Sequence, residues 1–144
     1  MKEFKLERHY LLRLDKDEEL FSTLENWATK NNIQGGYLKG IGALKDVELG
    51  FYHLEQKHYD KVLFPREAEL LSLDGNMSFK EGSPFFHIHA VLGNEKFEAF
   101  GGHLFSAKVA VTAEIQFIPF DARLDRAMNE EIGLSLLSSC AHAT

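Results

Sequence analysis

The sequence predicts an α+β protein in which one helix packs against a large, mostly antiparallel β-sheet. Only one segment, residues 16–31, carries apolar residues at a well-defined helical spacing. Between that segment and Pro119, several short runs alternate apolar with polar residues or are rich in β-branched and aromatic ones, as strands are. A run of strands with a single helix is typical of the α+β class. No Pro- or Ser-rich linker and no repeat divides the 144 residues, so we expect a single domain over residues 1–144.

The N-terminal part is predicted to form one strand followed by the helix. Residues 4–14 alternate loosely between apolar and polar, which indicates a strand. Asp15, with Glu18 three residues later, resembles a capping box at the start of a helix. Paired asparagines and glycines between residues 31 and 36 end that helix. Its apolar stripe consists of Leu20, Leu24, Trp27 and Ala28.

The segment from residue 36 to about residue 119 is expected to be β-structure. Residues 47–52 alternate apolar with polar side chains, and residues 54–57 fit a turn into a strand over residues 59–64. The secondary structure of the tail after Asp121 is undecided, because residues 124–128 suit a helix whereas residues 133–137 suit an extended chain. Further strands are expected at residues 69–73, 85–92, 97–104 and 109–117.

Composition limits the functional classes. Acidic residues outnumber basic ones by 22 to 16, and the resulting net charge of −6 disfavours a broad electrostatic contact with a phosphate backbone. The single cysteine, Cys140, cannot form an internal disulfide, which fits a reducing compartment. The sequence has neither an apolar signal-peptide core at its start nor a run of membrane-spanning length. We therefore expect a cytoplasmic protein without a membrane partner.

Three histidines carry the strongest functional signal. His87 and His89 lie two residues apart in the strand expected over residues 85–92, so both side chains face the same way, about 6–7 Å apart at Cα. A Gly-Asn-Glu-Lys turn at residues 93–96 then folds the chain back, so His103 can reach the same face from a neighbouring strand. Neutral imidazoles that converge from two strands form a divalent-metal site that suits zinc.

Two interpretations of these histidines stay open. Each one alone is most simply a core or edge residue that is hydrogen-bonded to the backbone. Three of them within 17 residues, two at i and i+2, favour a metal site instead. Three protein ligands leave zinc a fourth position for water or another ligand, as in catalytic or ligand-sensing sites. The order of metal affinities also admits nickel or copper.

Other residues give weaker signals. Glu114 lies in the otherwise apolar strand expected over residues 109–117, either as a solvated carboxylate or as a group that orients a ligating imidazole or acts as a base. Glu69 has the same two interpretations. Gly101 and Gly102 indicate a bulge or tight turn, or else room for a ligand to approach the metal. Exposure to solvent is expected for His9, His53, His58 and His142, and the pair Cys140 and His142 is only a weak signal for a second metal site.

Four blocks of the sequence resemble a prokaryotic PPC domain, the plant-and-prokaryote family, and the resemblance covers nearly the whole chain. It implies a seven- or eight-stranded antiparallel sheet with a packed helix, a homotrimer, and a metal, commonly zinc, held by His87, His89 and His103. It also implies an association with DNA, although plant members contact DNA largely through Arg-Gly-Arg-Pro segments, which this sequence lacks. The blocks are residues 40–47 (GIGALKDV), 69–76 (ELLSLDGN), 87–90 (HIHA) and 101–104 (GGHL), of which the final two are the most specific.

The leading hypothesis is a metal-binding, homotrimeric PPC-type module with a regulatory, DNA-associated or ligand-sensing role. A small molecule or an anion would bind at its metal. The alternative is a zinc-dependent hydrolase or lyase of a small substrate, with water activated by the metal and Glu114 as base. The sequence contains no phosphate-binding loop, no Ser–His–Asp order and no HExxH motif, so whether the chain is an enzyme stays open.

Overall fold

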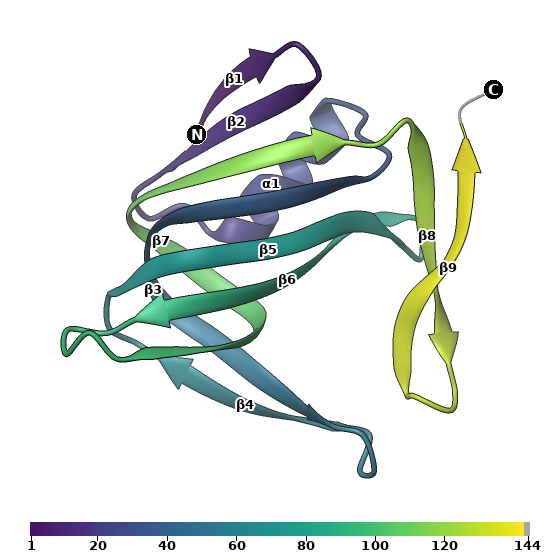
Figure 1. Cartoon of the computed structure of the whole chain (residues 1–144). Coiled ribbons are helices and arrows are strands. Elements are labelled where there is room, and N and C mark those ends of the chain that lie inside the picture. The colour runs from purple at the N-terminus through teal and green to yellow at the C-terminus, as the bar shows by residue number, and fades with distance from the viewer. Residues whose placement is uncertain (143–144) are drawn as a thin grey trace.

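The computed structural model describes residues 1–142, which form a nine-stranded sheet and one helix (Figure 1). The main path through the sheet is β1-β2-β7-β3-β5-β8-β9, while β4 pairs with β3, and β6 pairs with both β5 and β7. The predicted combination of a mostly antiparallel sheet with one helix is confirmed, but the sheet has nine strands rather than seven or eight. In chain order the elements are β1 (Lys2–Leu6), β2 (His9–Asp15), α1 (Leu20–Lys30), β3 (Gly36–His53), β4 (His58–Phe64), β5 (Ala68–Lys80), β6 (Ser83–Gly93), β7 (Ala99–Pro119), β8 (Ala122–Asn129) and β9 (Leu134–His142).

The N-terminal elements differ from the prediction in two places. The single strand expected over residues 4–14 is a hairpin, because Glu7 turns the chain with a positive φ of 48° between β1 and β2. The helix begins later than expected, at Leu20, and its cap is Glu19, whose carboxylate accepts the Ser22 N–H at 2.7 Å. The reciprocal bond of a capping box does form, since Glu18 accepts the Asp15 N–H at 2.7 Å, but it closes the turn that precedes the helix.

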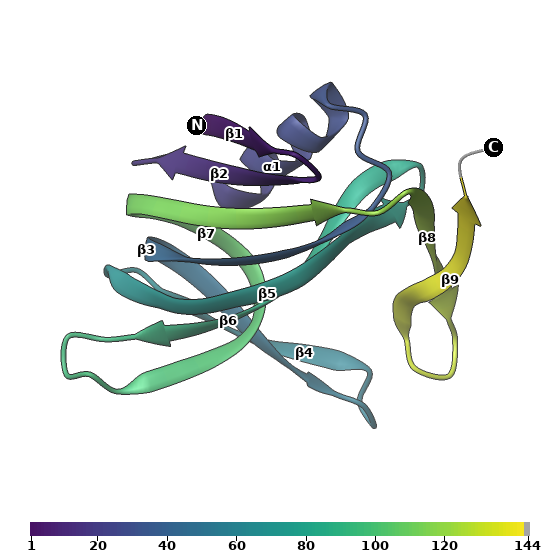
Figure 2. The same ribbon diagram turned by 45° about the horizontal axis from the view of Figure 1, so that its top comes forward.

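Helix α1 packs its predicted apolar stripe on one side of the sheet, near β2 and β7 (Figure 2). Trp27 contacts Tyr10 and Phe117 edge to face, with ring centroids 5.1 and 5.0 Å apart. Its indole N–H donates to Glu3 at 2.6 Å, so the polar end of the ring is satisfied. Within residues 1–142, no helix has the length and apolar character that crossing a membrane requires.

Strand β7 is one continuous element of 21 residues rather than the two strands expected over residues 97–104 and 109–117. Its first part, Ala99 to His103, pairs with β6, and its later part pairs with β2. Register shifts in its pairing with β3 bend the strand without breaking it. The bend carries β7 away from β6 just after His103, and this divergence makes room for the site described below.

The tail after residue 121 is extended. Strands β8 and β9 form an antiparallel hairpin, and β8 lies parallel to the end of β5 through the pairs Phe79–Asp125 and Lys80–Arg126. The hairpin stands at one end of the sheet, drawn in green and yellow in Figure 1. This placement brings Arg126 against strand β5, a contact that the local sequence pattern of the tail does not reveal.

Candidate metal site

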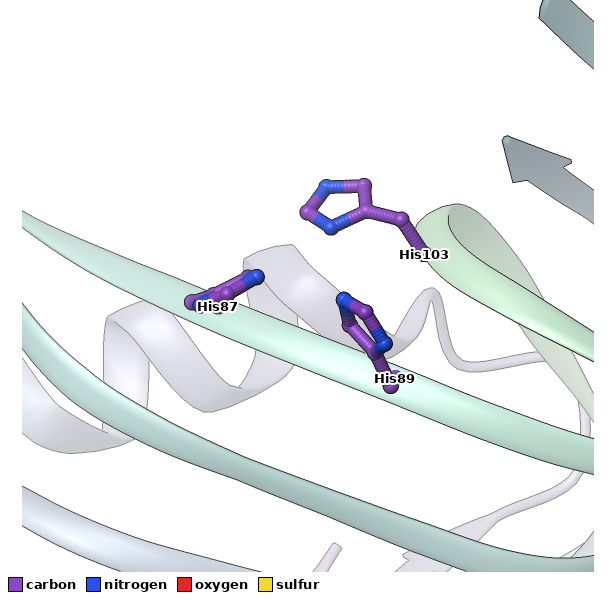
Figure 3. A group of neighbouring side chains, drawn as sticks. All are labelled: His87, His89 and His103. Carbon is purple, nitrogen blue, oxygen red and sulfur yellow. The ribbon is translucent and has the colours of Figure 1, made fainter. Parts of the chain in front are cut away.

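The structure brings His87, His89 and His103 together. His87 and His89 project from β6, and His103 reaches toward them from β7 (Figure 3). The three ring centroids are 5.1 to 5.4 Å apart, and one nitrogen from each ring lies within 4.8 Å of the others. Tetrahedral zinc with bonds of about 2.0–2.1 Å needs its ligand nitrogens somewhat closer, which small rotations of the imidazoles provide.

Strand alternation explains why the β6 histidines share a face. Phe86, Ile88 and Ala90 are at most 3% exposed and belong to the core. His87 and His89 alternate with them and therefore project from the opposite side of the strand. The hydrophobic side chains of β6 thus set the direction of the histidines.

The glycines before His103 do not form the predicted bulge or tight turn. The β6–β7 ladder is regular from Ala99 to His103, so Gly101 and Gly102 form neither a bulge in this pairing nor a turn. A Cβ atom on Gly101 would overlap the backbone oxygen of Ala90, and one on Gly102 would lie 2.8 Å from that of Gly50. The two glycines therefore let β7 approach both of its neighbouring strands closely, which holds the imidazole of β7 opposite those of β6.

Burial keeps two of the imidazoles neutral. Burial lowers the pKa of His103 to about 4, with further contributions from His87 and His89. Burial, followed by the charges of Arg126 and His89, also lowers the pKa of His87. Nδ1 of His103 is buried and has no hydrogen-bond partner within residues 1–142. Neutral nitrogens with a free lone pair, one of them buried and unsatisfied, are the donors that a divalent metal takes.

A pocket of about 420 Å³ opens beside the histidines where β7 leaves β6. His103 forms part of its wall and packs on Tyr59 and Phe105, with ring centroids 5.2 and 4.6 Å away. The pocket is therefore aromatic next to the imidazoles. Its wall also includes Phe21, Glu25, Lys80, Phe85, His87 and Arg126.

Glu114 does not join this site. It lies eleven residues beyond His103 on β7, exposed and in register with Arg13 and Ile41, and it is outside both the histidine group and the pocket wall. Glu69 also lies outside them, opposite Gly93 in the β5–β6 ladder. The carboxylate that does line the pocket is Glu25, whose pKa is raised by burial and by Glu19.

The remaining predicted residues lie elsewhere. His53 contacts Asp60 at 2.8 Å on the β3–β4 hairpin, and the exposed His58 lies 3.8 Å from the same carboxylate. His9 and Cys140 are exposed, while the side chain of His142 falls outside the described residues, so the pair Cys140 and His142 is not tested. The sequence interpretation missed Arg126 and Tyr59, because both reach the site through tertiary contacts of hairpins.

Comparisons with known proteins agree with this geometry. A family model described as the Plants and Prokaryotes Conserved (PCC) domain matches residues 1–121. A comparison of the sequence with curated proteins finds no match.

Solved structures from several organisms share the fold along nearly their whole length. The metal-containing protein AF0104 from Archaeoglobus fulgidus is 37% identical with a TM-score of 0.87, and the match covers 96% of this chain and 100% of that one. A PPC protein from Pyrococcus horikoshii is 36% identical with a TM-score of 0.85 and 94% coverage of each chain. A "putative DNA-binding protein" from Bacteroides thetaiotaomicron is 26% identical with a TM-score of 0.91, over 95% of this chain and 96% of that one.

Proposed function

The chain belongs to the Plants and Prokaryotes Conserved domain family, and on that premise we propose that it is a metal-binding, ligand-sensing module. His87, His89 and His103 hold the metal, which is zinc because imidazole nitrogens and a three-ligand set suit that ion. When bound, zinc supplies a positive charge and a coordination position that an external ligand can take.

The observation that carries this proposal is Nδ1 of His103, which is buried and has no hydrogen-bond partner among the described residues. An unsatisfied polar atom inside a protein costs on the order of 1–3 kcal/mol, and a metal in contact with the imidazoles would explain why this fold keeps one here. The lowered pKa values of His87 and His103 support the same proposal, because both rings are neutral at pH 7. The relative from Archaeoglobus fulgidus, which is named as metal-containing, adds support from the family.

The hydrolase or lyase alternative has less support. It relied on Glu114 as the base, and Glu114 lies on a different part of β7, outside the pocket. Glu25 lines the pocket from α1. Within residues 1–142, however, its carboxylate forms no hydrogen bond or salt bridge with the histidines. Ligand binding and sensing need only the metal, its open coordination position and the pocket.

Self-association is part of the proposal, with three copies as the family resemblance implies. Four exposed hydrophobic side chains, three on the sheet and one in the turn between β6 and β7, form an apolar patch that lines two neighbouring shallow depressions. An exposed patch of this kind is typical of a protein–protein contact. The patch consists of Ile41 (58% exposed), Leu71 (51%), Phe97 (98%) and Val111 (68%).

The metal content of the purified protein tests the main claim. Protein purified without chelators should carry close to one zinc per chain by elemental analysis. His87→Ala should lose most of the metal, whereas His58→Ala, a matched change of an exposed histidine, should keep it. The proposal would be refuted if the wild-type protein contained no metal, or if both variants contained the same amount of metal.

A further inference from the structure

The pocket beside the histidines carries a cation that has no counter-ion in the part of the chain that the structure describes. Arg126 of β8 is half-buried and lines the pocket together with His87 and His103. Within residues 1–142 it pairs with no carboxylate, whereas Arg13 and Arg123 each form a salt bridge with an aspartate. A half-buried charge that has hydrogen bonds but no carboxylate partner is suited to receive an anion.

Three hydrogen bonds hold the guanidinium in place. Nε of Arg126 donates to Oγ of the fully buried Ser78 at 2.8 Å, and Nη2 donates to Oδ1 of Asn76 at 2.9 Å. Nη1 donates to the backbone oxygen of Ser135 at 3.0 Å. A guanidinium carries more N–H donors than these bonds use. Arg126 is therefore a pre-positioned cation with donors to spare for a ligand.

The guanidinium lies next to the histidines. Asn76, which accepts from its Nη2, is directly opposite His87 in the β5–β6 ladder. Side chains at opposite positions on one face of a ladder are about 5 Å apart at Cβ. The charge of Arg126 also contributes to lowering the pKa of both His87 and His103. A ligand held by Arg126 would therefore lie beside the imidazoles.

The surroundings favour an anion with an apolar body. Lys80 lines the pocket near Phe85, and Nζ of Lys61 lies 3.7 Å from the ring centroid of Phe105. Lys61 is paired with Glu48 at 3.0 Å and does not line the pocket. Within residues 1–142 the lining therefore contains two cations, Arg126 and Lys80, and one carboxylate, although the whole chain has a net charge of −6. Aromatic rings and leucines make up much of the remaining wall, which offers contact area for a flat hydrocarbon group.

We propose that this pocket binds a small aromatic carboxylate, with the carboxylate at Arg126 beside the histidines and the ring against Phe85 and Phe105. The inference rests on the proposed metal site, because the charge of a bound metal adds to the attraction of Arg126. Arg126 and the β9 part of the wall lie beyond residues 1–121 that the family model matches. The C-terminal hairpin therefore determines which ligands the metal site accepts.

Benzoate and cobalt are the probes for a test in two stages. Co²⁺ is first titrated into metal-free protein and its visible absorption gives the stoichiometry, which tests the metal site alone. Benzoate is then titrated by calorimetry into the cobalt-loaded and the metal-free protein, with benzamide as the uncharged control of the same shape. We expect benzoate to bind the cobalt-loaded form at least about tenfold more tightly than benzamide, and more tightly than it binds the metal-free form.

Variants of two arginines on β8 test which of them benzoate binding depends on. Arg126→Gln should weaken benzoate binding at least about tenfold while cobalt stoichiometry stays the same, and Arg126→Lys should restore part of the affinity. Arg123→Gln, a matched change at an arginine already paired with Asp125, should leave benzoate binding unchanged. Thermal melts confirm that the variants are folded.

The outcomes separate the two proposals. If cobalt binds but benzoate binds no better than benzamide, or binds Arg126→Gln as well as wild type, the carboxylate pocket is overturned and the metal site stands. If cobalt does not bind, the metal proposal fails. The benzoate titration of the metal-free protein then decides whether the pocket binds a carboxylate. Benzoate binding that depends on Arg126 would then support the pocket, and its absence would overturn it. The benzoate–benzamide comparison on wild type decides the question even if Arg126→Gln does not fold.

Discussion

His89 and His103 lie directly opposite each other in the β6–β7 ladder, with their ring centroids 5.4 Å apart. His87 follows two residues along the same face of β6, so strand pairing rather than a loop conformation sets the spacing of all three rings. The same alternation buries Ile88 between the two β6 histidines. Any change that displaces β6 against β7 should therefore weaken metal binding.

Gly101→Ala tests this dependence on strand pairing. Its new methyl group would overlap the backbone oxygen of Ala90, so β7 must move away from β6. We expect a loss of about 1–3 kcal/mol in the free energy of unfolding of the metal-free protein, together with weaker zinc binding. Urea unfolding and a competitive zinc titration measure the two effects.

Gly82→Ala is the matched control for that change. Gly82 has a φ of +81° but open space around it, so an alanine there strains the backbone by about 1 kcal/mol without touching the histidines. Its zinc affinity should equal that of wild type. Equal loss of zinc affinity in both variants would mean that general stability, rather than the β6–β7 spacing, governs the site.

The metal-free protein should lose stability as the pH falls from 6.5 to 4. Burial lowers the pKa of His103 to about 4 and also lowers that of His87, whereas both are near 6.5 in the unfolded chain. In this window the unfolded chain binds protons that the folded chain does not, so the stabilisation is complete above the window and is lost below it. The effect of His103 is at most about 3 kcal/mol and is reduced by solvent screening.

Urea unfolding with a chelator at about pH 7 and about pH 5 measures this loss. Asp15 and Asp74, whose pKa values are lowered, titrate below this range. Glu25, whose pKa is raised by burial, acts in the opposite direction, so the measured loss is a lower limit for the histidines. His103→Gln removes one titrating group and should flatten the dependence. Stability that is equal or higher at the lower pH in wild type would contradict the assignment of neutral imidazoles.

Val111→Asp should disrupt self-association. Val111 is 68% exposed and lines both depressions of the apolar patch, so a carboxylate buried there in a subunit contact would be without a partner. Val62→Asp makes the same change at a valine that is 54% exposed on β4, outside the patch, and should leave the assembly intact. Light scattering coupled to size-exclusion chromatography gives the mass of each. A monomeric wild type, or an intact Val111→Asp assembly, would refute the role of the patch.

The protein alone should bind duplex DNA only weakly. Its net charge of −6 disfavours a broad electrostatic contact with the phosphate backbone, so we expect a dissociation constant weaker than about 1 μM at physiological salt. Fluorescence anisotropy with a short labelled duplex measures it. Tight binding that falls steeply with added salt would show instead that the assembly gathers its basic residues on one face.

The histidine site was predictable from the sequence because its determinants are local. The period-2 pattern of β6 places His87 and His89 on one side, and the turn before β7 returns the chain within a few residues. Such features depend on neighbours in the sequence. The convergence of His103 with them follows from a simple hairpin connection.

The other parts of the site depend on contacts that no local pattern reveals. Arg126 reaches the pocket because β8 pairs in parallel with β5, across nearly fifty residues of sequence. The bend in β7 arises from register shifts against β3, so the sequence alone shows a break where the structure has one strand. For Glu114, its place in an otherwise apolar strand left two interpretations open, a solvated carboxylate or a residue of the site. The structure places it exposed on the later part of β7, away from the histidines, which agrees with the solvated carboxylate.

Anomalous diffraction at the zinc absorption edge shows whether the three histidines hold a zinc ion. Crystals of protein purified without chelators should show one strong peak per chain, about 2.0–2.1 Å from a nitrogen of His87, His89 and His103. Nδ1 of His103, which is buried and has no hydrogen-bond partner within residues 1–142, would gain the most from that contact. A map with no peak between the three rings, in crystals whose protein was never exposed to chelators, would contradict the account.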